Sequence, residues 1–406
     1  MKKDPFYNLY NIIIDSNKDI KASMFKNLGD SDPTDLAVAD FGIEFDINNI
    51  EDYAMAIQQQ YLIFHDQEPI NFEHQKDKWA KSKILFNKGQ TNHILGNSEI
   101  NSIEKDALLS FTGWKDFYWF SNGFLALEWY RYYQYASYLE EQWEPQFLFS
   151  CYNRIIKNRP HRTAIAKALL KLDHKKIILS YTGEDDASSS IVINTTNTNR
   201  ENMAYTILTE DFANSFCHIV TERLFDEDRI HLTEKVFRPI VCCRPFILVS
   251  SPGSLQYLKS YGFKTFDKFW DEGYDNIQDH NKRIEAIIKL INTIQDTNAL
   301  NEMRSILIYN RNHFYNEFKQ IITNELWSNL KNASDNKDSN GIWKQIIATL
   351  TVEQIETLKM PGEITADDVP FNQLDYLSFD AALQQEYFEK YTKYFRFIYQ
   401  STLHLN

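Results

Sequence analysis

Glycine is scarce in this chain, with 12 residues in 406, against an average usage of about 7%. No two glycines are two positions apart, so there is no GxGxxG loop, and a Walker A loop is absent as well. The HExxH helix of zinc proteases, the GxSxG elbow of α/β hydrolases and the Cys/His spacings of zinc sites are also missing. These absences exclude the usual dinucleotide oxidoreductases, P-loop kinases, zinc proteases and serine hydrolases.

Cysteine and long apolar runs are rare too. None of the four cysteines (Cys151, Cys217, Cys242 and Cys243) stands in a CxxC spacing, which predicts reduced core thiols and favours a reducing compartment. No run approaches the roughly 18 apolar residues of a spanning helix. The apolar run Ile12–Ile14 is too short for a signal peptide. We therefore expect a cytoplasmic protein without a membrane span.

Positive charge is in deficit, because the formal net charge is -13 and the pI is near 5.3. Affinity for nucleic acid and anionic membranes comes from positive charge, so neither is a favoured partner. A hydrophobic content of 43% and an aromatic content of 15% indicate a well-packed globular protein. The length is sufficient for two domains.

Strands and helices alternate in the second half of the chain, which predicts an α/β domain with a parallel sheet. Strands are expected at 147–150, 176–180, 215–221 and 246–249, and helices from Pro160 and at 233–242, 254–261, 283–292 and 299–326. The acidic, Ser/Thr/Asn-rich segment 183–202 reads as a loop. In the first half, a strand at 61–64 precedes His65–Pro69, and Lys83–Phe86 and the region around Leu95–Glu99 indicate a further strand and turn. Residues 114–139 are rich in aromatic side chains. We interpret those aromatics as a helix or platform against the core, with a sugar- or base-stacking surface as the alternative.

Charged residues cluster where a strand is predicted to give way to a helix. Thr233 is a credible N-cap, with Glu234 and Lys235 in the first turn that follows. Exposed N–H groups and cations at such a position favour a phosphate, whereas a carboxylate suits a sugar hydroxyl. Arg223, Arg154 and Arg162 stand at other strand ends and suit phosphate contacts. Phosphate and ribose together are what a nucleotide-sugar donor presents.

The stretch 221–266, TERLFDEDRIHLTEKVFRPIVCCRPFILVSSPGSLQYLKSYGFKTF, resembles the donor-binding motif of alpha-1,3-fucosyltransferase-like glycosyltransferases of the GT-B fold. The branch found in bacteriophages and bacteria is the most similar. Further segments that fit this branch are Tyr152–Arg154, His161–Arg162, His65–Pro69, Phe269–Asp275 and Arg283. The segment Asp226–Thr233, between two Thr-Glu pairs, departs from the motif.

The resemblance implies two Rossmann-like domains facing a cleft, with C-terminal helices packing across both. Domains are accordingly expected at residues 1–143 on the acceptor side and 144–330 on the donor side, with a flexible loop and helices at 331–406. Such enzymes invert the anomeric centre and need no metal. On this reading the residues that bind the nucleotide sugar are Glu234 at the ribose, Lys235 and Arg223 at the diphosphate, and Arg154, Arg162, Asn153 and Thr233 beside them.

Inversion requires a general base for the acceptor hydroxyl, and a carboxylate in the facing domain is suited to that role. Glu68 and Asp66, just beyond the strand 61–64, are the candidates, with Glu68 favoured because Pro69 fixes the local backbone. The other carboxylates considered are Asp15, Glu44 and Glu99.

Several alternatives stay open. Asp226-Glu227-Asp228 is a DxD, which in other glycosyltransferases holds Mg²⁺ or Mn²⁺. The acceptor is expected to be a saccharide or small hydroxyl compound, and in a phage-infected cell it could instead be a hydroxymethylated DNA base. A nucleotide- or glycan-binding protein without catalysis is the remaining alternative. The sequence does not indicate the donor sugar or the oligomeric state.

Overall fold

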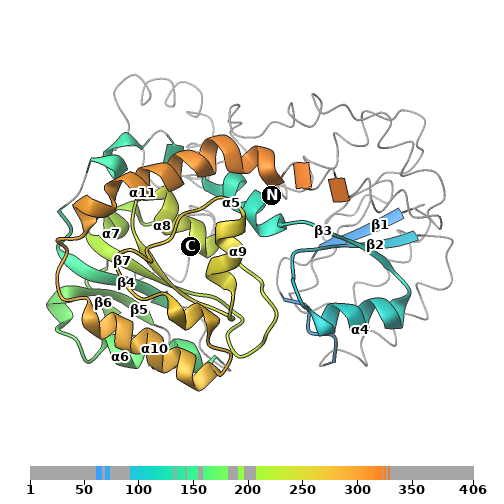
Figure 1. Ribbon diagram of the computed structural model, residues 1–406, viewed down its shortest axis with the longest axis horizontal. Helices are drawn as coiled ribbons and strands as arrows, with labels where there is room; N and C mark the ends of the chain where they lie inside the picture. Colours follow the sequence, from blue (N-terminus) through green and yellow to red (C-terminus); the bar gives the residue numbers. More distant parts are fainter. Residues whose placement is uncertain are drawn as a thin grey trace, which may run out of the picture.

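The computed structural model of the chain describes residues 61–65, 69–73, 92–130, 133–134, 136–141, 144–153, 159–181, 191–195, 207–322, 324–325 and 328–329. Their strands form two separate sheets with helices around them (Figure 1). The fold is therefore α/β, as predicted. Residues 1–60 and the loop and helices predicted at 331–406 lie outside the described residues, and the domain boundaries at 143 and 330 stay predictions.

The first sheet has three parallel strands in the order β1-β2-β3: β1 (Tyr61–His65), β2 (Asn92–Asn97) and β3 (Lys115–Tyr118). Helix α4 (Ile103–Thr112) connects β2 to β3. Ser102 caps its first turn by accepting a hydrogen bond from the backbone N–H of Lys105. Gly113 ends it at φ 73°, in the left-handed region that glycine adopts without strain. The predicted strand at 61–64 is confirmed, and β2 includes the first residues of the strand-and-turn region predicted around 95–99, whereas 83–86 lie outside the described residues.

The second sheet has five strands in the order β6-β5-β4-β7-β8: β4 (Phe147–Asn153), β5 (Ile177–Tyr181), β6 (Ile191–Ile193), β7 (Ser215–Thr221) and β8 (Phe246–Val249). All neighbours are parallel except β5 and β6. The four strands expected here are confirmed, but the loop predicted at 183–202 is wrong at β6. Its three β-branched residues suit a strand and pair antiparallel with β5 at the sheet edge.

The helices of this second part are α6 (Pro160–Leu169), α7 (Thr209–Ala213), α8 (Phe237–Val241), α9 (Ser254–Ser260), α10 (His280–Thr293) and α11 (Leu300–His313). In Figure 1, α6 and α10 lie below the sheet and α7, α8 and α11 above it. Short 3-10 turns are η3 (Ser137–Glu140), η4 (His174–Lys176), η6 (Glu234–Val236) and η7 (Gly273–Asn276).

Two predicted helices are interrupted in the structure. The one expected at 233–242 is the 3-10 turn η6 followed by the short α8, so it is not a regular helix that begins at Thr233. The one expected at 299–326 changes from α11 to a π-helical turn, η8 (Phe314–Phe318). Propensity and apolar spacing do not distinguish these tighter and wider turns from an α-helix.

The described aromatic side chains of segment 114–139 belong to the core or pack against it, as the first of its two interpretations predicted, although part of the segment is β3 rather than helix. Helix α5 (Ser121–Tyr130) follows β3, and Trp119 and Phe120 between them are at most 1% exposed. The Phe120 ring lies 4.9 Å from the Tyr261 ring and 5.9 Å from the Phe237 ring, centroid to centroid. This aromatic contact joins the end of the first sheet to the helices of the second.

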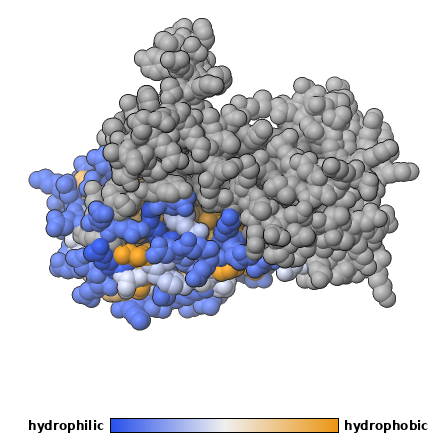
Figure 2. Space-filling view, turned by 90° about the horizontal axis from the view of Figure 1, so that it is seen from above, coloured by the Kyte–Doolittle hydropathy of each residue, from blue (hydrophilic) through white to orange (hydrophobic). Residues whose placement is uncertain are grey.

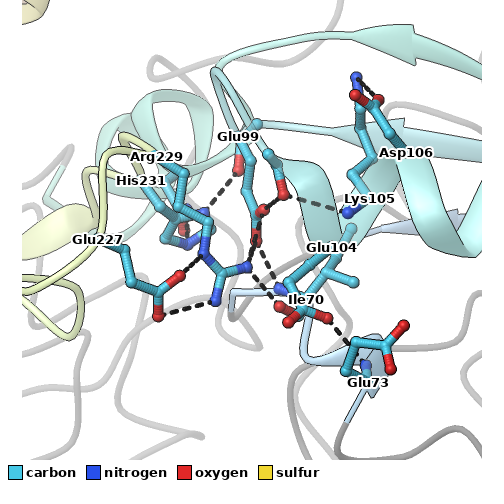
Figure 3. Close-up of polar contacts among 12 residues, drawn as sticks. Ile70, Glu73, Glu99, Glu104, Lys105, Asp106, Glu227, Arg229 and His231 are labelled. Atoms are coloured by element: carbon cyan, nitrogen blue, oxygen red, sulfur yellow. Dashed lines mark hydrogen bonds and ion pairs between the residues drawn. The ribbon is translucent and has the colours of Figure 1, made fainter.

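A second link between the sheets runs through the loop that follows β7. Ile230 and Ile100 form an antiparallel bridge with both N–O distances at 3.0 Å. Arg229 lies between two carboxylates (Figure 3): its Nη1 is 3.1 Å from Glu99 Oε2, and its Nε is 2.5 Å from Glu227 Oε2. Next to it, His231 contacts the side chains of Ser98 and Asn122. The segment Asp226–Thr233, a departure from the fucosyltransferase motif, thus contacts the chain just beyond β2.

The surface of the described residues is mostly polar. On the face shown in Figure 2, hydrophobic side chains form only small, separate areas. The large exposed apolar side chains are Ile103, Val192 and Ile321, on three different elements. All four cysteines are buried and free, as predicted. Within the described residues, no helix combines the length and apolar character that crossing a membrane requires.

The two carboxylates on Arg229 allow a matched test of this link. Glu99 is fully buried, so Glu99→Gln leaves the arginine charge without its buried partner and should lower the free energy of unfolding by about 3 kcal/mol. The Glu227 side chain is 47% exposed, so Glu227→Gln should cost less than about 1 kcal/mol. Urea unfolding of the two variants measures both values. Equal losses would contradict the assignment of the inter-sheet link to Glu99.

Candidate functional site

The order of the second sheet singles out one position at its carboxyl edge. From β4 the chain passes through α6 to β5 on one side, whereas β7, on the other side of β4, is followed by β8 still further out. The topology therefore reverses between β4 and β7. In open α/β sheets, ligands bind in the crevice outside the carboxyl ends of the strands at such a switch point. The ends of these two strands are Asn153 and Thr221.

Polar side chains connect the two strand ends. Thr221 Oγ1 donates a hydrogen bond to Asn153 Oδ1 across the pair of strands. Arg162, on α6, donates from Nη2 to the Thr221 carbonyl oxygen over 3.2 Å. Asn153 is 1% exposed and Arg162 5%. Of the predicted site residues, these two therefore form a buried polar base beneath the switch point.

Glu222, directly after β7, binds Thr233 and Lys235 next to the switch point. Its carboxylate is fully buried and accepts hydrogen bonds from Thr233 N at 3.1 Å and Thr233 Oγ1 at 2.7 Å. Lys235 Nζ lies 2.8 Å from Thr233 Oγ1 and 3.5 Å from Glu222 Oε2. The Lys235 side chain is 33% exposed, so a positioned ammonium group is accessible to solvent above the switch point.

Glu234 is held from the other side. Its Oε1 lies 3.9 Å from Arg238 Nη2, and Arg238 Nε donates to the Tyr130 hydroxyl on α5 at 2.9 Å. The Glu234 side chain is 10% exposed. The structure thus brings together four of the predicted site residues at one end of β4 and β7 (Asn153, Arg162, Thr233 and Lys235), and Glu234 lies between two of them in sequence.

The structure describes one of the four remaining predicted site residues. Arg223 is half-buried and follows Glu222 at the end of β7. Arg154, Asp66 and Glu68 lie outside the described residues. Glu99, one of the further carboxylates considered as a base, is instead bound to Arg229, Ser102 and the Ile70 backbone N–H (Figure 3).

Among the described residues, the DxD carboxylates do not cluster with other side chains that could bind a metal ion. Asp226, Glu227 and Asp228 are all exposed, and Glu227 is bound to Arg229. The described part of the chain contains no group of three or more His, Cys, Asp or Glu side chains placed to hold a metal ion. The expected absence of a metal requirement stays a prediction.

A stack of three side chains beside the site was not predicted. The His161 ring lies 4.9 Å from the Phe225 ring at an interplanar angle of 17°. The Arg283 guanidinium lies 4.4 Å from the same ring and donates to the Phe225 carbonyl oxygen. His161 Nε2 hydrogen-bonds the Glu222 carbonyl oxygen at 3.0 Å. His161 and Arg283 occur in segments that fit the fucosyltransferase-like branch, but nothing in the sequence indicated that both contact Phe225.

The comparisons with known proteins add no relative. No protein-family model matches the chain, and neither a curated protein nor a solved structure is significantly similar to it. The resemblance to fucosyltransferase-like enzymes stays a prediction, and the geometry of the switch-point cluster is what supports a function.

The buried His161 predicts a loss of stability in mild acid. Burial lowers the pKa of its imidazole from 6.5 to about 4. The unfolded chain binds a proton near pH 6.5, whereas the folded chain does so only near pH 4. The free energy of unfolding should therefore have its full value above pH 6.5 and fall by up to about 3 kcal/mol as the pH is lowered toward 4.

His161→Gln keeps a donor for the Glu222 carbonyl but does not titrate, so its urea-unfolding free energy should fall less steeply over this pH range. The pKa of His218, which burial lowers to about 3, contributes equally to both proteins. Parallel pH curves for the wild type and the variant would show that His161 is not the group responsible.

Proposed function

We propose that this chain is an inverting glycosyltransferase that moves a sugar from a nucleoside-diphosphate sugar to an acceptor hydroxyl. The observation that carries the proposal is the position of Lys235, whose ammonium group is fixed at the switch point by Thr233 and Glu222 and is still partly exposed. Nucleotides bind at such points in other α/β proteins, with cations near their phosphates.

Lys235 has the hydrogen-bonding capacity that a phosphate requires. An ammonium group carries three N–H donors, and its contacts with Thr233 and Glu222 use two of them within the described part of the chain. The third donor is assigned to a diphosphate oxygen. Arg223, next to Glu222 in the chain, and Arg154 are assigned to the same diphosphate, and Arg162 adds positive charge below it.

Glu234 is assigned to the ribose. A carboxylate accepts hydrogen bonds from two vicinal hydroxyls, and the nearby Arg238 pairs with this one and orients it. Glu222 cannot take this role because it is fully buried and already accepts from Thr233 and Lys235. The two glutamates thus have different tasks, one positioning the cation and the other binding the sugar of the nucleotide.

The contacts between the sheets support a GT-B arrangement of two Rossmann-like domains. The segment after β7 meets the segment after β2 at the bridge between Ile230 and Ile100, so the carboxyl edges of the two sheets approach each other. Strand β1 is parallel to β2, with His65 opposite Gly96. Asp66 and Glu68 therefore follow a strand whose carboxyl end belongs to the same edge.

In the proposed reaction, Glu68 or Asp66 accepts the proton of the acceptor hydroxyl. The acceptor oxygen forms a bond to the anomeric carbon from the face opposite the diphosphate, and the bond from that carbon to the diphosphate oxygen breaks. Lys235 and the arginines stabilise the negative charge that develops on the leaving diphosphate. A saccharide or small hydroxyl compound is the favoured acceptor, because a net charge of -13 opposes the binding of DNA.

Lys235→Ala tests the role of the cation. Removing it should lower turnover by about 10² or more, because charge on the leaving group is then stabilised less. The assay measures release of nucleoside diphosphate from GDP-, UDP- and ADP-linked sugars with and without acceptor. Lys268→Ala, at an exposed lysine outside the cluster, is the matched control and should keep wild-type turnover. Near-normal turnover of Lys235→Ala would contradict the proposal.

The same assay separates an enzyme from a binding protein. Glu68→Ala or Asp66→Ala should abolish transfer while nucleotide binding persists, if one of them is the base. Unchanged behaviour of both variants, combined with nucleotide binding and no transfer by the wild type, would favour the non-catalytic alternative.

A further inference from the structure

An open cavity of ≈ 610 Å³ lies at the opposite edge of the second sheet. It is formed between the beginning of β7, the segment 269–274, helix α10 and the beginning of α11, on the side away from the first sheet (Figure 1). Phe216, in its lining, is five residues before Thr221 on β7, which is about 16 Å along a strand. The cavity is therefore separate from the switch-point site, and its volume is that of a small-ligand site.

The interior of this cavity is apolar and aromatic. Phe216, Tyr274, Leu290 and Met303 line it and are each at most 7% exposed. Trp270 also lines it, and the indole Nε1 of this tryptophan is buried with no hydrogen-bond acceptor among the described residues. Because that nitrogen is buried, a ligand in the cavity contacts the carbon atoms of the indole and not its N–H.

The rim of the cavity carries exposed polar side chains: Asp271, Asp296, Lys289 and Gln295. Two carboxylates against one ammonium group disfavour a polyanion such as a nucleotide. Carboxylate and amide oxygens instead accept hydrogen bonds from hydroxyl groups, and the ammonium and amide groups donate to them.

We propose that this cavity is a second ligand site and that it binds a neutral saccharide. A pyranose presents an apolar face to the aromatic side chains and its hydroxyls to the rim. This is the combination of apolar lining and few polar groups that fixes a small ligand. The site does not depend on the donor-site proposal, because saccharide binding needs neither nucleotide nor turnover.

The competing ligands fit less well. A protein partner would need a continuous apolar surface, whereas the exposed apolar side chains of the described residues are scattered singly. A nucleotide would bring its phosphates against Asp271 and Asp296. The saccharide is the ligand whose charge and hydrogen-bonding groups match the interior and the rim together.

The test uses saturation-transfer difference NMR on the full chain with glucose, galactose, mannose, fucose and N-acetylglucosamine, each without nucleotide. At least one neutral sugar should give a signal. Ala286→Trp fills the cavity from α10 and should abolish it. Trp270→Ala removes the indole surface from the lining and should weaken binding about tenfold.

Lys282→Ala is the control, because this lysine is exposed on the same helix but does not line the cavity, and its signal should equal that of the wild type. Melting temperatures show which variants are folded. If Ala286→Trp does not fold, Trp270→Ala decides the matter. The proposal would be overturned if no sugar gave a signal, or if the signal persisted unchanged in both cavity variants. It would also be overturned if GDP displaced the sugar from the Lys235→Ala variant, in which the proposed donor site is impaired.

Discussion

The arrangement of the site depends on one buried carboxylate. Glu222 has no exposed surface, so its oxygens must be satisfied within the protein, and its three donors come from Thr233 and Lys235 farther along the chain. These contacts close the intervening segment into a loop. The middle of that loop, at Arg229 and Ile230, contacts the chain beyond β2, and its end carries Lys235 above the switch point. The same interaction therefore positions the proposed phosphate contact and the link between the sheets.

Buried arginines hold the elements around this loop by the same principle. Arg311, on α11, donates to the carbonyl oxygens of Val241 and Tyr133 and pairs with Glu140 at 3.0 Å. Arg244 donates to the carbonyl oxygens of Phe212 and Ala213 at 3.0 and 2.7 Å. A guanidinium group has five donors in a rigid plane, so it can satisfy carbonyl groups at several chain ends at once. Short helices such as α7 and α8 are thereby fixed to the sheet without long apolar faces of their own.

The sequence predicted those elements whose signal is local. The apolar runs at β7 and β8 and the proline at the start of α6 were sufficient to place them within one residue. Strand β6 was missed because three residues at a sheet edge are too few to form a pattern. The grouping of Asn153, Arg162 and Lys235 followed from the rule for strand ends. The task of Glu222 and the pairing of Arg229 with Glu99 did not, since partners 13 and 130 residues apart leave no periodicity in the sequence.

The most direct test of the switch-point site is its effect on the melting temperature. We would record melting curves with GDP, UDP, ADP and CMP, each in EDTA and again with Mg²⁺ or Mn²⁺. A nucleotide present at about 100 times its Kd stabilises the folded chain by about 2.7 kcal/mol. We expect one nucleoside diphosphate to raise the melting temperature in EDTA, and Lys235→Ala to lose this increase. No increase with any nucleotide would contradict the proposed switch-point site. An increase only with metal would indicate that the diphosphate binds through a metal ion at Asp226 and Asp228.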